Sequence, residues 1–365
     1  MGKINRKRLL VPGFLFQSIV IGGGYGTGAE ISQYFQHSGF VGGLLGMAVT
    51  TVIWSVLCAV TFAFARAFQV YDYRSMMRRL TGETGQLLFE LSYIALMLMV
   101  LGVVNATAAA MASDLLGVPP WCGVAAVSLG VAALVLGGTE AIEKALSAWS
   151  YVLYAVYAVF AVICLRRFGG TIGAEWAAQE IGSGWALRGA QYAFYNLGCV
   201  PLVLYTVRQC RSRSEAVLSG LLAGVIGVLP AALLLVVLVG VPSTVGAEVP
   251  VAEVFAALQL PWLYAAFEIV LFGTLIETGT GFLKAIDDRI EVAVEQRLGF
   301  VPRGLRGAVT VIGVASGIAV SGFGLTAIIE KGYGSLCWAF ALFFALPMMT
   351  LGVWKLLGKR QNRNK

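Results

Sequence analysis

Residues 21–30 read IGGGYGTGAE, and this stretch decides the fold. It lies within an apolar run at residues 9–35, and a helix of roughly 20 residues is enough to cross a bilayer. Each glycine weakens a helix by about 1 kcal/mol relative to alanine. Lipid cannot satisfy unwound backbone at that depth, so such backbone must line a cavity enclosed by protein. We therefore predict that this first span is a broken helix, and that the break is a binding site.

A second interpretation of the glycines is close packing of two intact helices. Gly22 and Gly26, and likewise Gly24 and Gly28, have the four-residue spacing of small residues that lets transmembrane helices approach. In that case Tyr25 is an ordinary packing residue. Transporters do interrupt hydrophobic segments at their binding sites, which favours the break.

The composition is that of an integral membrane protein built from helices. Hydrophobic residues make up 58% of the 365 and charged residues 12%, against about 25% charged in soluble domains. The six cysteines are scattered without a CxxC pair and there is one histidine, so we expect no metal centre. The net charge of +7 is explained by membrane orientation, and we expect no nucleic-acid partner.

Apolar segments predict ten spans. They cover residues 9–35, 40–65, 86–112, 121–136, 147–165, 188–207, 215–240, a span from about 261 with a charged extension at 284–297, 304–322 and 333–357. Residues 66–83 are expected to form a short interfacial helix, and 166–187 are too polar to cross. Most of the 26 Lys and Arg residues fall in the segments on the side of both termini, which predicts cytoplasmic termini.

Ten spans divide into two sets of five. Because the first set has an odd number of spans, the second set starts on the opposite side of the membrane and is inverted relative to the first. A second interruption, at residues 195–201 (YNLGCVP), falls in the first span of the second set. Paired interruptions in two halves are the sequence signature of a site at the bilayer midplane. We thus predict a first repeat at 1–170, an inverted repeat at 171–357 and a basic cytoplasmic tail at 358–365.

Two motifs resemble a known family. IGGGYGTGAEISQYFQHSGFVGG and the later QYAFYNLGCVPLVL are similar to the first-span and sixth-span patterns of the YkvI-type bacterial membrane proteins. That family resembles a distant branch of the amino acid–polyamine–organocation superfamily. The resemblance implies a LeuT-like fold with broken helices 1 and 6, in the bacterial inner membrane. It implies transport and names no substrate.

The break offers groups of both polarities. The outer half-helix, starting near Gly26 to Ala29, has free N–H groups that favour an anion such as a carboxylate. The inner half ends near Gly22 to Gly24, and its carbonyl groups favour a cation. The predicted substrate-binding residues here are Gly22, Gly23, Gly24, Tyr25, Gly26, Thr27, Gly28 and Glu30. Glu30 is a membrane-embedded carboxyl, which is functional by default, or else makes a structural hydrogen bond or meets outer water.

The second interruption adds Tyr195, Asn196 and Gly198 to the predicted substrate site. An asparagine can satisfy freed backbone groups, so Asn196 either caps the break or contacts the ligand.

The eighth span carries a polar stripe at helical spacing, formed by Thr274, Glu277 and Thr278. With Gly22 and Tyr25, these residues form the predicted ion-coupling site. Threonine hydroxyl groups facing the first span would complete a Na⁺ site, whereas a buried Glu277 would carry a proton. Alternatively, the stripe only bonds to neighbouring helices. Glu268 lies off the stripe and is a weaker candidate.

The sequence has no nucleophile elbow, Walker loop or HExxH motif, and GGGYGTG follows no strand, so it is not a dinucleotide fingerprint. We therefore predict a non-enzyme without cofactors, apart from Na⁺ or H⁺ as a coupling ion. The predicted function is secondary active transport, by alternating access, of a small amino-acid-like or zwitterionic solute. The alternative is a nutrient sensor on the same fold that binds solute without transporting it. The expected partners are the solute and the lipid bilayer.

Overall fold

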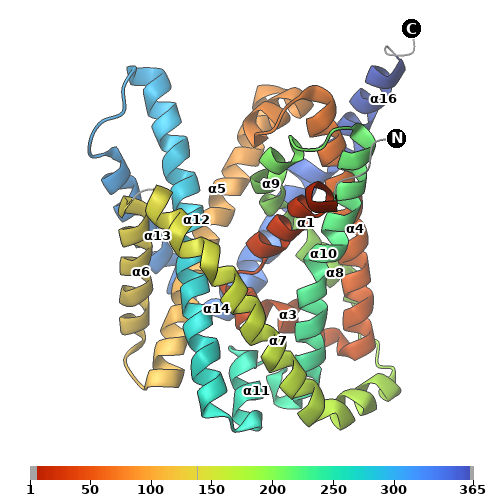
Figure 1. The fold of residues 1–365 in the computed structure, drawn as a ribbon, viewed down its shortest axis with the longest axis vertical. Coiled ribbons are helices and arrows are strands. Elements are labelled where there is room, and N and C mark those ends of the chain that lie inside the picture. Colours follow the sequence, from red (N-terminus) through yellow and green to blue (C-terminus); the bar gives the residue numbers. More distant parts are fainter. Residues whose placement is uncertain (1–5, 138, 362–365) are drawn as a thin grey trace.

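The computed structural model describes residues 6–137 and 139–361, and every regular element in these ranges is a helix (Figure 1). Seven helices there are long and apolar enough to cross a membrane, and Arg8–Val20 and Leu305–Ser321 are shorter apolar helices. The prediction of a helical, multi-pass membrane protein is confirmed at this level. The count of ten spans stays a prediction.

The predicted break in the first span is present. The chain forms α1 (Arg6–Val20), the single turn α2 (Gly23–Gly26) and α3 (Ala29–Tyr34). Gly22 is extended, with φ −113° and ψ −167°, and Gly28 has φ +80°, a conformation that favours glycine. Helical hydrogen bonding is therefore interrupted twice within one apolar run.

A first group of helices packs around the early part of the chain. It comprises α1, α4 (Gly39–Phe68), α8 (Trp185–Asn196), α9 (Val200–Val207) and α10 (Arg213–Val239). Hydrogen bonds join these helices, since Trp54 Nε1 donates to the carbonyl oxygen of Ala193 at 2.9 Å and Ser219 Oγ to that of Leu9 at 2.8 Å. Such bonds satisfy side-chain groups that lipid cannot.

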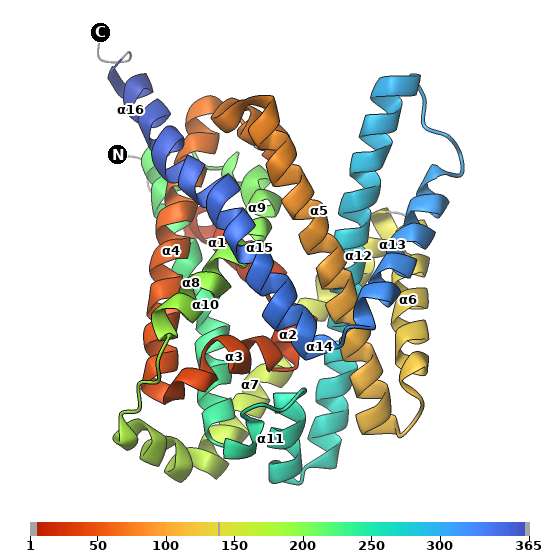
Figure 2. The same ribbon diagram turned by 180° about the vertical axis from the view of Figure 1, so that it is seen from behind.

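A second group comprises α5 (Tyr73–Leu116), α6 (Pro120–Gly137), α12 (Pro261–Leu298) and α13 (Leu305–Ser321). The Ser128 hydroxyl donates to Asn105 Oδ1 at 2.9 Å, so Asn105, in the third predicted span, joins α5 to α6. Figure 2 shows the two groups side by side, with α5 and α12 facing the first group.

The predicted interfacial helix is the first part of α5. Asp72 caps it by accepting a hydrogen bond from Ser75 N at 2.8 Å. The helix turns sharply at Gly82, which has φ +79° and ψ −170°, and the spanning part follows.

The second predicted interruption is milder than expected. A 3₁₀ turn, η2 (Leu197–Cys199), links α8 to α9, and the backbone dihedrals remain right-handed helical throughout. Pro201 is accommodated because it lies in the first turn of α9, where its missing N–H needs no helical partner. The helix therefore tightens at this point and does not unwind.

Three predicted boundaries move. The fifth span was expected at 147–165, but α7 (Thr139–Ala178) extends into the segment considered too polar to cross. The last span was expected at 333–357, but its helical stretch begins earlier, with α14 (Leu325–Ala327) and the π-helical segment η4 (Ile328–Tyr333). After α15 (Gly334–Phe340), η5 (Ala341–Ala345) and η6 (Met348–Gly352), helix α16 (Val353–Gln361) enters the predicted tail, whose residues 362–365 lie outside the described part.

Candidate functional site

A small cavity lies at the first break, between the two groups of helices. Its volume is about 30 Å³, which is room for an ion or about one water molecule. The lining comes from α1, α5, α12 and the segments around both predicted interruptions. The lining residues that could contact a ligand through polar side chains or exposed backbone are Gly22, Gly23, Glu30, Tyr195, Asn196, Cys199, Thr278 and Tyr333.

Glu30 is the only carboxylate among the described lining residues, and it is 4% exposed. Its side chain folds back over the break, because a Cβ on Gly24 would lie 2.6 Å from Glu30 Oε1. The Tyr195 hydroxyl donates a hydrogen bond to the other carboxylate oxygen, Oε2. Gly24, Glu30 and Tyr195, all predicted site residues, therefore form one unit.

A cluster of tyrosine rings surrounds this unit. The rings of Tyr195 and Tyr333 stack with centroids 4.5 Å apart, and Tyr34 lies 5.7 Å from Tyr195 and 5.5 Å from Tyr192. The Tyr34 hydroxyl donates to the carbonyl oxygen of Ile329 at 3.3 Å. Sequence reasoning missed Tyr192 and Tyr333, because only the packing of distant helices brings them to Glu30.

The first span is interrupted again at Gly28, and there other helices bind the freed backbone groups. Val251 N, in α11 (Pro250–Leu258), donates to the carbonyl oxygen of Thr27 at 3.0 Å. The Tyr157 hydroxyl of α7 donates to that of Gly26 at 3.3 Å. The backbone predicted to receive an anion therefore contacts α7 and α11, and it does not line the cavity.

Several predicted glycines serve close packing. A Cβ on Gly23 would lie 2.7 Å from Leu275, and one on Gly26 would overlap Leu271, both on α12. Gly198 packs against Leu96 and Phe340. The span is therefore not an intact helix, as the second interpretation required, but its glycines do allow the close packing that this interpretation expected.

The side chains of Tyr25, Thr27 and Asn196 bond or pack locally. Tyr25 is fully buried away from the cavity. The Thr27 hydroxyl donates to the carbonyl oxygen of Gly24 at 3.1 Å. Asn196 lines the cavity, but its Nδ2 donates to the carbonyl oxygen of Tyr192 at 3.0 Å, leaving its amide oxygen for other partners.

The predicted ion-coupling residues are only partly brought together. Thr278 lines the cavity, and its methyl group would lie 3.8 Å from a Cβ on Gly22. The Thr274 hydroxyl donates to Val270 of its own helix at 2.9 Å, and Glu277 is half-buried outside the cavity. The stripe therefore touches the break at one position only.

Two further buried polar groups, one of them next to the break, were missed or ranked low. The Thr107 hydroxyl is fully buried, has no hydrogen-bond partner among the described residues, and lies 3.3 Å from the position of a Cβ on Gly23. Glu268 is 2% exposed, and its Oε2 has no partner, so it is more buried than Glu277. Helical spacing could not reveal either feature, since both depend on neighbouring helices.

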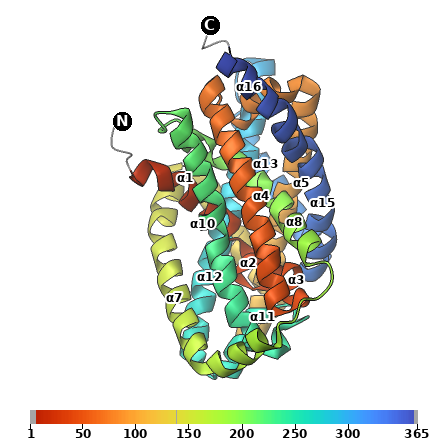
Figure 3. The ribbon, with the colours of Figure 1, turned by 90° about the vertical axis from the view of Figure 1, so that its right-hand side faces the viewer.

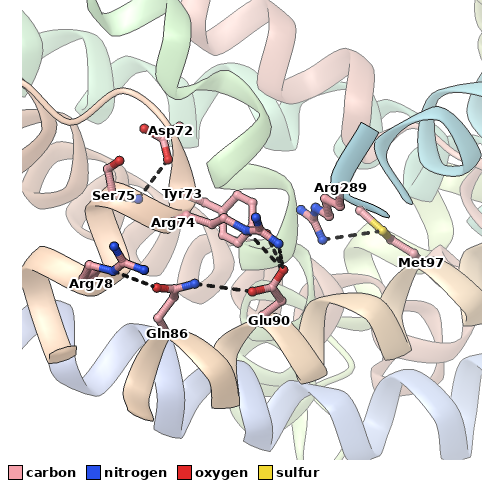
Figure 4. A network of polar contacts seen from close by, with 9 residues as sticks. All are labelled: Asp72, Tyr73, Arg74, Ser75, Arg78, Gln86, Glu90, Met97 and Arg289. Atoms are coloured by element: carbon pink, nitrogen blue, oxygen red, sulfur yellow. Dashed lines mark hydrogen bonds and ion pairs between the residues drawn. The ribbon is translucent and has the colours of Figure 1, made fainter. Parts of the chain in front are cut away.

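A network of polar contacts joins the first part of α5 to the charged extension of α12 (Figure 4). The Arg289 guanidinium packs against two aromatic rings, 4.3 Å from the centroid of Tyr73 and 4.0 Å from that of Tyr93. Glu90 forms an ion pair with Arg74 at 2.6 Å. The network thus joins the interfacial helix, the spanning part of α5 and the extension of α12.

Comparisons with known proteins identify a fold and no family. No protein-family model matches the chain. No curated protein resembles it in sequence. The similarity to YkvI-type proteins therefore stays a prediction.

Solved structures share its architecture. A Na⁺-coupled sialic acid symporter in a substrate-bound, outward-open state has a TM-score of 0.65 at 11% identity, covering 91% of this chain and 78% of that one. MhsT in complex with L-phenylalanine has a TM-score of 0.64 at 13% identity, covering 98% of both chains. Both are LeuT-fold transporters, and the chain shares their fold.

Proposed function

We propose that this protein is a secondary active transporter of a small organic solute, working by alternating access between the two groups of helices. The observation that carries the proposal is a buried carboxyl group, Glu30, at a broken span where the two groups meet. Intramembrane carboxyl groups and broken helices both mark transport pathways. The proposal includes ten spans in a five-plus-five inverted repeat, with the termini on the cytoplasmic side of a bacterial inner membrane.

The cavity favours a positive charge. It combines the Glu30 carboxyl group with the end of α1, where the helix dipole is negative. No Lys or Arg is among the described lining residues, so no side-chain cation opposes this preference. The occupant in our proposal is Na⁺, a proton on Glu30 or the ammonium group of the solute. Gly22 and Thr278 would bind the ion directly, whereas Tyr25, Thr274 and Glu277 would not contact it.

The cavity is large enough for an ion but too small for the solute. About 30 Å³ accepts an ion but no amino acid, so the solute would enter only when the groups part. Amino acids and other zwitterions are the first candidates, because they carry the ammonium group that the cavity favours. One structural neighbour holds L-phenylalanine and the other is a Na⁺-coupled symporter, which supports this choice.

The test is uptake of radiolabelled amino acids into proteoliposomes under an imposed Na⁺ or H⁺ gradient. We expect saturable uptake driven by one of the two gradients, and its loss in Glu30→Gln. Glu268→Gln is the matched control, because it neutralises a second buried carboxyl group outside the cavity. Equal, mild effects of both substitutions would contradict the role of Glu30. Saturable binding without flux under either gradient would indicate the sensor instead.

A further inference from the structure

A second and larger cavity lies at the end of the molecule that carries both termini. Its volume is about 1010 Å³, and it opens where the end of α4, the start of α10 and α16 meet, at the top of Figure 3. No described residue lines both this cavity and the one at Glu30. Its lining comprises Arg66, Ala67, Gln69, Arg211, Ser212, Arg213, Ser214, Val217, Leu218, Leu221 and Lys359.

Four basic side chains converge on it: Arg66, Arg211, Arg213 and Lys359. Within the described part of the chain, none of them forms an ion pair with a carboxylate. Glu215 is close by, but its carboxylate accepts a hydrogen bond from the backbone N of Arg211 at 2.7 Å. The positive charge of the cavity is therefore not neutralised by salt bridges.

The basic side chains are held in place by neutral acceptors. Arg66 donates to the carbonyl oxygen of Arg211 and to the hydroxyl of Tyr71, both at 3.2 Å. Arg213 donates to the carbonyl oxygen of Leu356 at 3.4 Å, and Lys359 to that of Ala67. An anionic acceptor in this cavity would form charge-assisted hydrogen bonds with the basic side chains that line it, and such bonds are stronger than those to neutral carbonyl groups.

One wall of the same cavity is apolar. Leu218 and Leu221, on the first turns of the spanning helix α10, are 39% and 41% exposed. The basic groups and the hydroxyl groups of Ser212 and Ser214 lie at the membrane-surface end of this wall. A free phosphate ion would satisfy only the basic part, whereas a phospholipid matches both parts.

We propose that this cavity binds an anionic phospholipid, with the headgroup phosphate on the four basic residues and an acyl chain along Leu218 and Leu221. Basic pockets between transmembrane helices on the cytoplasmic side recognise such headgroups. The bound lipid would join α4, α10 and α16, which meet here with few charged contacts of their own.

The experiment uses the full-length protein purified in detergent. Native mass spectrometry measures retention of phosphatidylglycerol, phosphatidylcholine and inorganic phosphate, and thermal denaturation is followed with each added. We expect phosphatidylglycerol to be retained and to raise the melting temperature, and the other two to do neither. Equal retention of phosphatidylcholine would overturn the proposal, and so would equal stabilisation by inorganic phosphate, which would indicate a free-anion site.

The variant is Arg211→Gln with Arg213→Gln, and its matched control is Arg297→Gln with Arg303→Gln, two exposed residues at another part of the same end. Each basic residue near an anionic lipid contributes about a factor of five in affinity, so we expect binding about 30-fold weaker in the variant and unchanged in the control. Equal weakening in both would show that only net charge matters, and would overturn the proposal. The wild-type comparison among ligands decides the matter even if the variant does not fold.

Discussion

Substituting Gly24 by alanine should separate Glu30 from Tyr195. The new Cβ would lie 2.6 Å from Glu30 Oε1, where ordinary contact begins at 3.4 Å, so this oxygen must move by about 0.8 Å. Cγ and Cδ of Glu30, at 3.1 and 3.2 Å, are also too close. We expect the whole carboxyl group to turn with Oε1, so that Oε2 loses its hydrogen bond from Tyr195; leaving a buried acceptor unpaired costs about 1–3 kcal/mol. We expect the free energy of unfolding to fall by that amount.

The assay is SDS titration in mixed micelles, applied to Gly24→Ala, Tyr195→Phe and the double variant. Both substitutions break the same bond, so the double variant should lose less stability than the sum of the two, by about 0.5–3 kcal/mol. Gly281→Ala is the control, because a Cβ there meets nothing within 4 Å and alanine favours the helix. Additive losses, or a neutral Gly24→Ala, would refute the argument that Gly24 leaves room for the carboxyl group.

Three further outcomes are expected. Arg289→Ala removes the guanidinium packed against the Tyr73 and Tyr93 rings. In a chain whose other cysteines are replaced, a water-soluble thiol reagent should then modify Cys199, which lines the small cavity, severalfold faster. An unchanged rate would show that Arg289 does not limit access to that cavity. Burial and the neighbouring Glu215 carboxylate raise the pKa of the Cys210 thiol to about 11. The rate at which a thiol reagent labels Cys210 should therefore rise about tenfold per pH unit from pH 7 to 10. A rate that levels off near pH 8.5 would show a thiol with an ordinary pKa. Asp72→Ala should lower stability by about 1 kcal/mol, measured by the same titration, through loss of the helix cap; no change would show that the cap is dispensable.

Much of the fold could be predicted because local composition decides it. Glycines at 22 and 28 interrupt the first span where expected, since only glycine readily adopts the φ of +80° seen at Gly28. The second interruption was predicted as a break and is a 3₁₀ turn. Glycine and proline signal a change of helical pitch, and the packing around Gly198, against Leu96 and Phe340, decides how far the helix opens.

The site was less predictable, because its members come from distant segments. Glu30 and Tyr195 were both predicted, and the hydrogen bond between them joins residues 165 positions apart. The stripe on the eighth span was predicted from spacing alone, but spacing cannot say which face meets the break. Leu271 and Leu275 meet it, so the hydroxyl of Thr274 bonds within its own helix.

The distribution of polar contacts bears on how the two groups could move apart. Hydrogen bonds such as Trp54 to Ala193 stay within the first group, whereas α2 meets α12 through apolar contacts of Gly23 with Leu275. Separating apolar surfaces leaves no hydrogen bond unsatisfied, so opening at this seam avoids the largest penalty of moving helices in lipid.

Glu30 and Tyr195 would travel together in such an opening, because α3 packs against α8 and α10 of the first group. Thr278 belongs to the second group, and it lines the same cavity. A cation bound to Glu30 and Thr278 would therefore hold the groups together, and its departure would release them. An ion shifts the equilibrium between the joined and the separated helix groups only if it binds one arrangement more tightly than the other. The coupling of ion binding to this movement should therefore depend on Thr278 as well as on Glu30.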